Sequence, residues 1–283
     1  MKFIIVADTH FGYPDDCGFS MQTKYTAEAP EIFQALGEEA VAQNAEFIIH
    51  AGDLITDGTE EEIKRAVKHC HALPVPFYTV LGNHDTQPAN FKELWLKYGG
   101  PIFPQGTLET TLVQGGLRID LLNNAWGRAS ASWNQADETF TRLEPESFRR
   151  LRDGDQFLPR VIVIHSQIRP AYPRQTGEAD IIHPPCNGFD AVGDAIIREF
   201  HPLLIAGGHN HINILEKLED TYAVTVSSIT EAPFEYKLVE FKDNRLTMQT
   251  CSLAPRIPFP FTCNPNAAFV QGFPQDRQFE CRG

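Results

Sequence analysis

The feature that most constrains the fold of this chain is the alternation of short apolar runs with longer amphipathic stretches. Each run is four to six residues long, the length of a strand, and is apolar at nearly every position. Continuous apolar strands separated by helical patterns are typical of βαβ units, whose parallel strands are buried on both faces. The runs are "KFIIVA" 2–7, "FIIH" 47–50, "FYTV" 77–80, "VIVI" 161–164 and "LLIA" 203–206.

Helix and hairpin patterns occupy most of the remaining chain. The periodicity predicts helices over residues 28–43, 60–71, 90–98, 136–152 and 189–200. Three hairpins are predicted, at 109–124 with a turn at Gly115–Gly116, at 212–228, and at 234–250 with a turn at Asp243–Asn244. These added antiparallel strands favour a second sheet stacked on the first. We therefore expect an α/β domain over residues 1–250, followed by an irregular tail, 251–283, that packs on it.

Composition and charge narrow the class of protein. The net charge of −13 argues against a protein that holds nucleic acid on a broad basic surface, although bound cations would still allow an anionic substrate. The six cysteines form no C-x-x-C pair, and we expect them to be reduced thiols. The segment "KFIIVAD" is too short and too quickly charged for a signal peptide, and no run of about 20 apolar residues follows. We therefore expect a cytoplasmic protein without a membrane span.

Metal-competent side chains follow each of the five apolar runs. Ligands of open α/β sheets bind beyond the carboxyl ends of the strands. The isolated pattern "HNH" is also compatible with a solvated turn, but five strand ends in succession favour a metal site. The mixture of carboxylate, imidazole and amide oxygen suits Mn, Fe or Zn. These residues are Asp8, His10, Asp53, Asn83, His84, Asp85, His165, His209 and His211. Glycines that would allow close approach of the backbone to an ion precede them at positions 52, 82, 207 and 208.

The polar blocks, in their order along the chain, resemble the calcineurin-like metallophosphoesterases. The matching blocks are "DTH", "GDLI", "GNHD", a lone His after a strand, and "GHNH", and they span residues 8–211. The resemblance implies two stacked mixed β-sheets flanked by helices, with the metal site at the carboxyl ends of the strands. It also implies two divalent or trivalent transition-metal ions and a phosphoesterase that attacks its substrate with a metal-bridging hydroxide.

The resemblance also implies a role for each matched residue. Ligands of the first metal are matched by Asp8, His10 and His211. Ligands of the second metal are matched by Asn83, His165 and His209. Asp53 matches the carboxylate that bridges the two ions, His84 matches the family's non-ligand catalytic histidine, and Asp85 matches the acid thought to orient it. The chain departs from the family's cyclic-nucleotide phosphodiesterases at Ser166-Gln167, where many of those have a second His and prolines, and this leaves the substrate open.

Other polar residues have structural interpretations or two open ones. We expect His50 in the core, His69 and His71 in solvent, and His201 in a structural role. A solvated loop and a wall of the substrate pocket are both open for Asp15, Asp16 and Cys17. The Pro-rich insertion 169–185 is a candidate lid, in which substrate contacts could come from Arg169, Arg174 or His183.

The leading hypothesis is a dinuclear metal-dependent phosphodiesterase that acts on small-molecule or nucleotide diesters. The alternatives are a phosphomonoesterase of the same fold, a DNA nuclease and a non-catalytic scaffold. The complete set of ligand positions disfavours the scaffold, and the charge of −13 disfavours the nuclease. We therefore expect a small-molecule phosphate ester as the partner, with no stable nucleic-acid complex and no membrane; the sequence assigns no oligomeric state.

Overall fold

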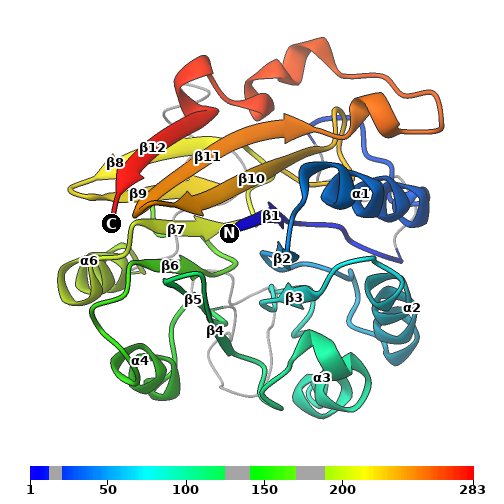
Figure 1. The fold of residues 1–283 in the computed structure, drawn as a ribbon. Coiled ribbons are helices and arrows are strands. Elements are labelled where there is room, and N and C mark those ends of the chain that lie inside the picture. Colours follow the sequence, from blue (N-terminus) through cyan, green and yellow to red (C-terminus); the bar gives the residue numbers. More distant parts are fainter. Residues whose placement is uncertain (13–20, 125–140, 170–188) are drawn as a thin grey trace.

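Two six-stranded β-sheets lie face to face, with helices on both outer faces (Figure 1). The computed structural model describes residues 1–12, 21–124, 141–169 and 189–283. The two sheets and their flanking helices confirm the α/β fold expected from the alternation of strand and helix patterns. Among the described residues, no helix has both the length and the apolar composition needed to cross a membrane.

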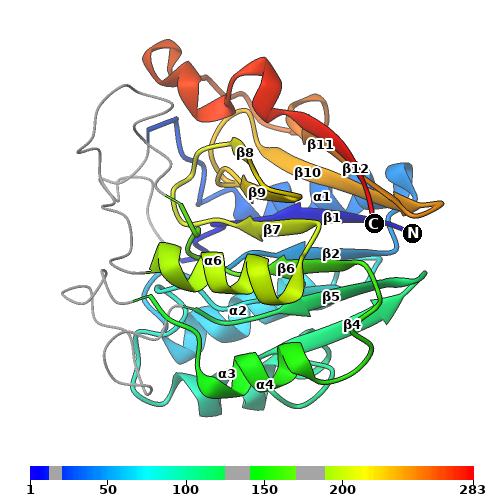
Figure 2. The same ribbon diagram turned by 90° about the vertical axis from the view of Figure 1, so that its left-hand side faces the viewer.

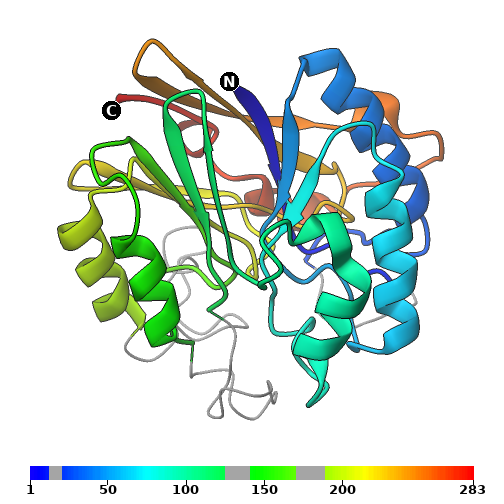
Figure 3. The same ribbon diagram turned by 60° about the horizontal axis from the view of Figure 1, so that its bottom comes forward.

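The first sheet has the strand order β12-β11-β10-β1-β2-β3. Three of its strands, β1 to β3, are parallel, and β10 pairs antiparallel with β1 and begins an antiparallel half. Three helices cover its outer face (Figure 3). The strands are β1 (Lys2–Val6), β2 (Phe47–His50), β3 (Phe77–Thr79), β10 (Glu235–Lys242), β11 (Arg245–Ser252) and β12 (Gln278–Arg282). The helices are α1 (Ala29–Gln43), α2 (Glu60–His71) and α3 (Phe91–Gly99).

The second sheet has the strand order β4-β5-β6-β7-β9-β8. Its four central strands are parallel, and β4 and β8 are antiparallel edge strands. Two helices, α4 (Pro145–Arg152) and α6 (Phe189–Phe200), cover its outer face. The strands are β4 (Thr110–Gln114), β5 (Leu117–Leu121), β6 (Arg160–Val163), β7 (Leu204–Gly207), β8 (Ile214–Leu218) and β9 (Thr221–Thr225).

Burial on both faces explains why the central strands are apolar at successive positions. In β1, the side chains of Phe3 and Ile5 belong to the core between the two sheets. Those of Ile4 and Val6 point the other way, into the core shared with α1, α2 and α3. Successive side chains of a strand point to opposite faces of the sheet. In a strand that is covered on both faces, every side chain is therefore buried, and apolar residues are favoured at every position.

The hairpin turns lie where the sequence predicts them. Gly115 and Gly116 join β4 to β5 with φ of 59° and 78°, and Asp243 and Asn244 join β10 to β11 with φ of 51° and 58°. Two-residue turns with both φ angles positive match the twist of the flanking strands, and Gly, Asn and Asp adopt them most easily.

Two predicted elements differ from the structure. The helix expected over 136–152 begins only at Pro145 within the described residues, because residues 141–144 are not helical. Proline suits the first turn of a helix, and it holds the preceding residue, Glu144, in an extended conformation with ψ of 156°. The tail expected to be irregular contains three short 3₁₀ helices, and its last strand, β12, pairs antiparallel with β11. The alternating sequence "QFECR" of β12 is the strand signal that the prediction missed.

Both chain ends lie at one end of the sandwich (Figure 2). Strand β1 runs from there toward the opposite end, where the side chains that follow the central strands of both sheets meet. The fold therefore places the expected metal ligands at one edge shared by the two sheets.

Candidate metal centre

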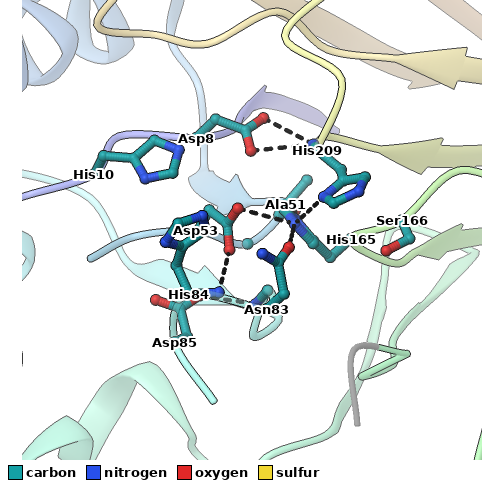
Figure 4. Close-up of polar contacts among 12 residues, drawn as sticks. Asp8, His10, Ala51, Asp53, Asn83, His84, Asp85, His165, Ser166 and His209 are labelled. Carbon is teal, nitrogen blue, oxygen red and sulfur yellow. Dashed lines mark hydrogen bonds and ion pairs between the residues drawn. The ribbon is translucent and has the colours of Figure 1, made fainter. Parts of the chain in front are cut away.

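Five strands from the two sheets supply the side chains of this centre (Figure 4). In the first sheet, Asp8 and His10 follow β1, Asp53 follows β2, and Asn83 and His84 follow β3. In the second sheet, His165 follows β6, and His209 and His211 follow β7. All of these side chains are buried except that of His84, which is partly exposed.

The carboxylates and imidazoles form three overlapping groups of three. Within each group the potential ligand atoms lie within 4.8 Å of one another. Asp53 belongs to two of the groups and His10 to two, so the three groups form one continuous cluster. The groups are Asp8, His10 and His211; His10, Asp53 and His84; and Asp53, His165 and His209.

The individual distances show how closely the ligand atoms converge. At one side of the cluster, His211 Nε2 lies 3.3 Å from His10 Nε2 and 3.5 Å from Asp8 Oδ1. At the other side, His165 Nε2 lies 3.1 Å from Asp53 Oδ2, 3.1 Å from Asn83 Oδ1 and 3.2 Å from His209 Nδ1. Carboxylate, imidazole and amide oxygen atoms gathered in this way match the donor set of borderline transition metals.

Hydrogen bonds at the far side of two imidazoles direct Nε2 into the cluster. His165 Nδ1 donates to the carbonyl of Ala51 at 2.8 Å, and His211 Nδ1 donates to Glu231 Oε1 at 2.6 Å. A ring whose Nδ1 carries the proton keeps the Nε2 lone pair free for a metal, which is the usual arrangement of metal-binding histidines.

The backbone at the cluster adopts conformations that most side chains avoid. Left-handed φ angles occur at five non-glycine residues there: Asp8 (55°), His10 (52°), Asp53 (56°), His209 (72°) and His211 (55°). Such residues cost roughly 1–3 kcal/mol each, and they concentrate at functional sites where the surrounding structure holds them in place. The accumulation of strain at these positions is therefore independent support for a functional site.

Two glycines allow the ligands to pack this closely. A Cβ at Gly82 would lie 2.1 Å from Asp53 Oδ1, and a Cβ at Gly208 would lie 2.6 Å from Asp8 Oδ2. Both distances are far shorter than a van der Waals contact, so a side chain at either glycine would displace a carboxylate. Glycine at these two positions therefore lets the carboxylates of Asp53 and Asp8 lie against the backbone.

The carboxylates and imidazoles of the cluster shift one another's pKa values. Burial lowers the pKa of His165, but Asp53 and Asp8 outweigh burial and raise it to about 9. Burial likewise lowers the pKa of His211, whereas Asp8 and Glu231 raise it to about 10. Burial raises the pKa of Asp53, but His165 and His84 hold it well below its usual value. The carboxylates thus stabilise positive charge at the positions where a cation would bind.

The structure contradicts the expectation that Asp85 orients His84. The Asp85 carboxylate accepts hydrogen bonds from the backbone N–H groups of Gly82, Leu54 and Ile55, at 2.8, 3.3 and 3.1 Å. Burial and the Asp53 carboxylate raise the pKa of Asp85 to about 7. Because its oxygens are directed at these backbone groups, Asp85 shapes the loops that carry Asp53 and Asn83.

A backbone carbonyl orients His84 instead. His84 Nδ1 donates to the carbonyl of Thr56 at 2.7 Å, and the backbone N–H of His84 donates to Asp53 Oδ1 at 2.9 Å. The His84 ring packs edge-on against that of His10, with centroids 4.8 Å apart. Nε2 of His84 therefore does not take part in the contact with Thr56, and a ring nitrogen of His84 lies within 4.8 Å of ligand atoms of His10 and Asp53.

Two adjacent asparagines, which the sequence reasoning missed, connect the loops of the two sheets. Asn124, after β5, accepts from the backbone N–H groups of His165 and Ser166 at 3.0 and 3.1 Å. Its neighbour Asn123 accepts from the backbone N–H of Leu81 at 2.7 Å, just before Gly82-Asn83. Both side chains are buried. Their sequence signal is the "NN" that directly follows the apolar run of β5, in the same way as the metal-competent side chains follow their strands.

The remaining histidines confirm some expectations and correct one. His50 is fully buried, with Nε2 2.9 Å from Thr9 Oγ1, as expected of a core histidine. His71 is exposed, although its Nε2 lies 3.1 Å from the carbonyl of Gly99. His69, expected in solvent, is partly buried because its ring stacks on Phe11, with centroids 5.3 Å apart. His201 is exposed and has a φ of 44°, as at many helix ends.

The candidate pocket and lid residues lie mostly outside the described residues. This applies to Asp15, Asp16, Cys17, Arg174 and His183. Arg169 is described, and its guanidinium forms an ion pair with Asp194 in α6. Four of the six cysteines are described, and all four are free thiols: Cys70, Cys251, Cys263 and Cys281.

A family model described as calcineurin-like phosphoesterase matches residues 1–213, which contain every strand end of the cluster. The chain belongs to the calcineurin-like phosphoesterase family. Membership of this family implies a hydrolase of phosphate esters and, together with the overlapping ligand groups, a dinuclear metal centre.

Solved structures of other proteins share this fold. A dimetal phosphatase from Danio rerio superimposes with a TM-score of 0.65 at 14% identity, covering 89% of this chain and 96% of that one. Purple acid phosphatase PPD1 from yellow lupin (Lupinus luteus) gives a TM-score of 0.58 at 12% identity, covering 100% of this chain and 53% of that one. At these identities the similarity concerns the fold.

One curated relative is also similar in sequence. The DNA double-strand break repair protein Mre11 of Archaeoglobus fulgidus is 33% identical over 90 residues, which are 30% of this chain and 19% of that protein. The matched part is thus about a fifth of the relative's length.

Proposed function

We propose that this protein is a dinuclear metal-dependent phosphodiesterase that hydrolyses small-molecule or nucleotide diesters. The observation that carries the proposal is the position of Asp53, which belongs to two of the three ligand groups. Its Oδ2 lies beside His165 Nε2, and the same carboxylate lies within 4.8 Å of the ligand atoms of His10 and His84. A carboxylate so placed can give one oxygen to each of two neighbouring ions.

The proposed ligands divide between the two sides of the cluster. The first ion would be held by Asp8, His10 and His211. The second ion would be held by Asn83, His165 and His209. Asp53 would bridge them, and the mixed donor set fits divalent or trivalent Mn, Fe or Zn.

In the proposed reaction, Asp53 and His84 each have a defined role beside the two ions. Two such ions, when bound, lower the pKa of a shared water and neutralise negative charge on the phosphate. Asp53 sets the separation of the two sites, and the backbone N–H of His84 holds one oxygen of Asp53 in place. His84, fixed by the carbonyl of Thr56, would face the phosphate and protonate the leaving oxygen or stabilise the charge that develops there.

The charge of the described part of the site favours a diester over a monoester. Buried carboxylates of Asp8, Asp53 and Glu231 surround the cluster. Burial lowers the pKa of His10, and the nearby cationic side chain of Lys24 lowers it further. A phosphomonoester carries about 1.5 to 2 negative charges at neutral pH. A diester carries fewer, so beyond the two ions it needs fewer cationic side chains to balance its charge.

A substrate panel tests the proposed function. Protein loaded with Mn should hydrolyse linear or cyclic diesters faster than phosphomonoesters, and a chelator should abolish the activity until Mn is restored. Faster hydrolysis of monoesters would identify a phosphatase instead. Activity that stays unchanged after treatment with the chelator would contradict a metal-dependent reaction of any kind.

The similarity to Mre11 makes a DNA nuclease the second candidate. The net charge of −13 opposes it, because nucleic-acid binding depends on basic side chains that neutralise phosphates. Supercoiled and single-stranded DNA therefore belong in the same panel, and we expect neither to be cut as fast as the small diesters.

A further inference from the structure

Glu231 is a buried carboxylate beside the cluster, and it lies outside the residues that match the family model. It follows β9, in the connection to β10, whereas the match ends at residue 213. Its side chain is 1% exposed and lies against His211. We propose that Glu231 is a positioning residue that fixes His211 for the first metal and raises the affinity of that ion alone. The inference rests on the proposed function, because it assigns His211 to one of the two ions.

The contact between Glu231 and His211 is short and directional. Glu231 Oε1 lies 2.6 Å from His211 Nδ1 and accepts its hydrogen bond. This leaves Nε2 of His211 pointing at Asp8 Oδ1 and at His10 Nε2, which are 3.5 and 3.3 Å away. A carboxylate on the outer nitrogen fixes the tautomer and the ring orientation and makes the imidazole a better electron donor.

Backbone pairing holds Glu231 in place independently of a metal. Residues Lys24 and Glu231 form an antiparallel bridge. On either side of it, the N–H of Tyr25 donates to the carbonyl of Thr230 at 2.8 Å, and the N–H of Ala232 donates to that of Thr23 at 3.0 Å. The carboxylate is therefore positioned before any ion binds, and such preorganisation is what a ligand-orienting group requires.

Residues of the C-terminal tail support the same bridge. The side chain of Gln22 donates to the carbonyls of Asn264 and Ala267 at 3.0 and 2.9 Å, and its backbone N–H lies 3.4 Å from Glu231 Oε2. The tail thus stabilises the strand segment that positions Glu231. Residues 264–267 are thus connected to His211 through hydrogen bonds of Gln22 and Glu231.

The other side of the cluster lacks this anionic arrangement at His165. There, the neutral carbonyl of Ala51 accepts the hydrogen bond of Nδ1. A full negative charge stabilises a metal-bound imidazole more than a carbonyl dipole does. Removing the charge of Glu231 should therefore lower the affinity for one ion and leave the affinity for the other unchanged. A general loss of protein stability would lower both affinities.

The test measures the affinity of both ions in Glu231→Gln, which keeps the size and an acceptor oxygen but removes the charge. Binding of Mn²⁺ alone is followed by competition with a chromophoric chelator and by the electron paramagnetic resonance of free Mn²⁺. Loss of an outer-shell partner typically costs 10–100-fold in metal affinity. We expect one of the two binding steps to weaken by about this factor, and the other to stay as in the parent.

Glu39→Gln is the matched control. Glu39 is a buried carboxylate in α1 that pairs with Arg256 and accepts from Tyr236, away from the cluster. Both of its Mn²⁺ binding steps should equal those of the parent. Unchanged binding in Glu231→Gln would overturn the inference and leave the proposed function standing, whereas a parent protein that binds no Mn²⁺ would overturn the proposed function itself.

If Glu231→Gln fails to fold, an NMR measurement on the unsubstituted protein can still test the inference. In Zn²⁺-loaded protein, the Nδ1 proton of His211 should give a slowly exchanging, downfield NMR signal, because a short hydrogen bond to a buried carboxylate holds it. Assignment of Nδ1 of His211 as unprotonated, or a rapidly exchanging proton there, would overturn the inference.

Discussion

Asp53→Ala is expected to lose activity by on the order of 10³-fold and to retain about one metal ion per chain instead of two. The carboxylate of Asp53 reaches both sides of the cluster, with Oδ2 3.1 Å from His165 Nε2 and the ligand atom of His10 within 4.8 Å. Without this shared anion, two neighbouring cations repel each other and one of them should dissociate. The loss corresponds to several kcal/mol of charge stabilisation by a metal pair, at about 1.4 kcal/mol for each factor of ten.

Two further variants make the Asp53 result specific. Asp8→Ala removes a carboxylate that belongs to one ligand group only, so its activity should fall less than that of Asp53→Ala. Asp57→Ala removes an exposed carboxylate four positions along the same loop and should leave both metal content and rate unchanged. Equal activity in Asp53→Ala and the parent would refute the bridging role.

His84→Ala is expected to lose rate by about 10²–10⁴-fold while it keeps both metals. The ring is held by the hydrogen bond from Nδ1 to the carbonyl of Thr56, so Nε2 remains for the substrate. If His84 protonates the leaving oxygen, the loss must depend on the leaving group. An alkoxide or ribose oxygen needs the proton, whereas p-nitrophenolate hardly does.

The measurement compares His84→Ala with the parent on bis-p-nitrophenyl phosphate and on an alkyl or nucleoside diester. We expect the larger loss on the alkyl or nucleoside diester. His71→Ala, which removes an exposed histidine of α2, serves as the control and should behave as the parent on both substrates. An equal loss on the two substrates would exclude the acid role and leave His84 as an electrostatic clamp on the phosphate.

Local sequence patterns were sufficient to predict most of the strands and most of the cluster. Each ligand directly follows an apolar run, and the carboxyl ends of parallel strands meet at one edge of a sheet, so strand order was not needed to expect that they converge. The two-residue turns at Gly115–Gly116 and Asp243–Asn244 were also predictable, because these residues themselves favour the required φ angles.

Contacts that depend on side-chain direction or on long-range packing were not predictable. Asp85 is adjacent to His84 in the sequence, yet three backbone N–H groups bind its carboxylate and turn it away. Glu231 lies 20 residues after His211 in a connection without a strand-end signal, and only the tertiary fold brings the two together. The strand β12 has only a five-residue alternating pattern of its own, and its position beside β11 depends on pairing between segments far apart in the sequence.

Metal content tests the central claim most directly. Protein purified without a chelator, or reconstituted with Mn, should contain close to two transition-metal ions per chain by elemental analysis, because the ligand atoms form overlapping groups that share Asp53. Circular dichroism on the same sample verifies that the chain is folded. A folded protein whose metal content stays near zero after Mn addition would contradict the account.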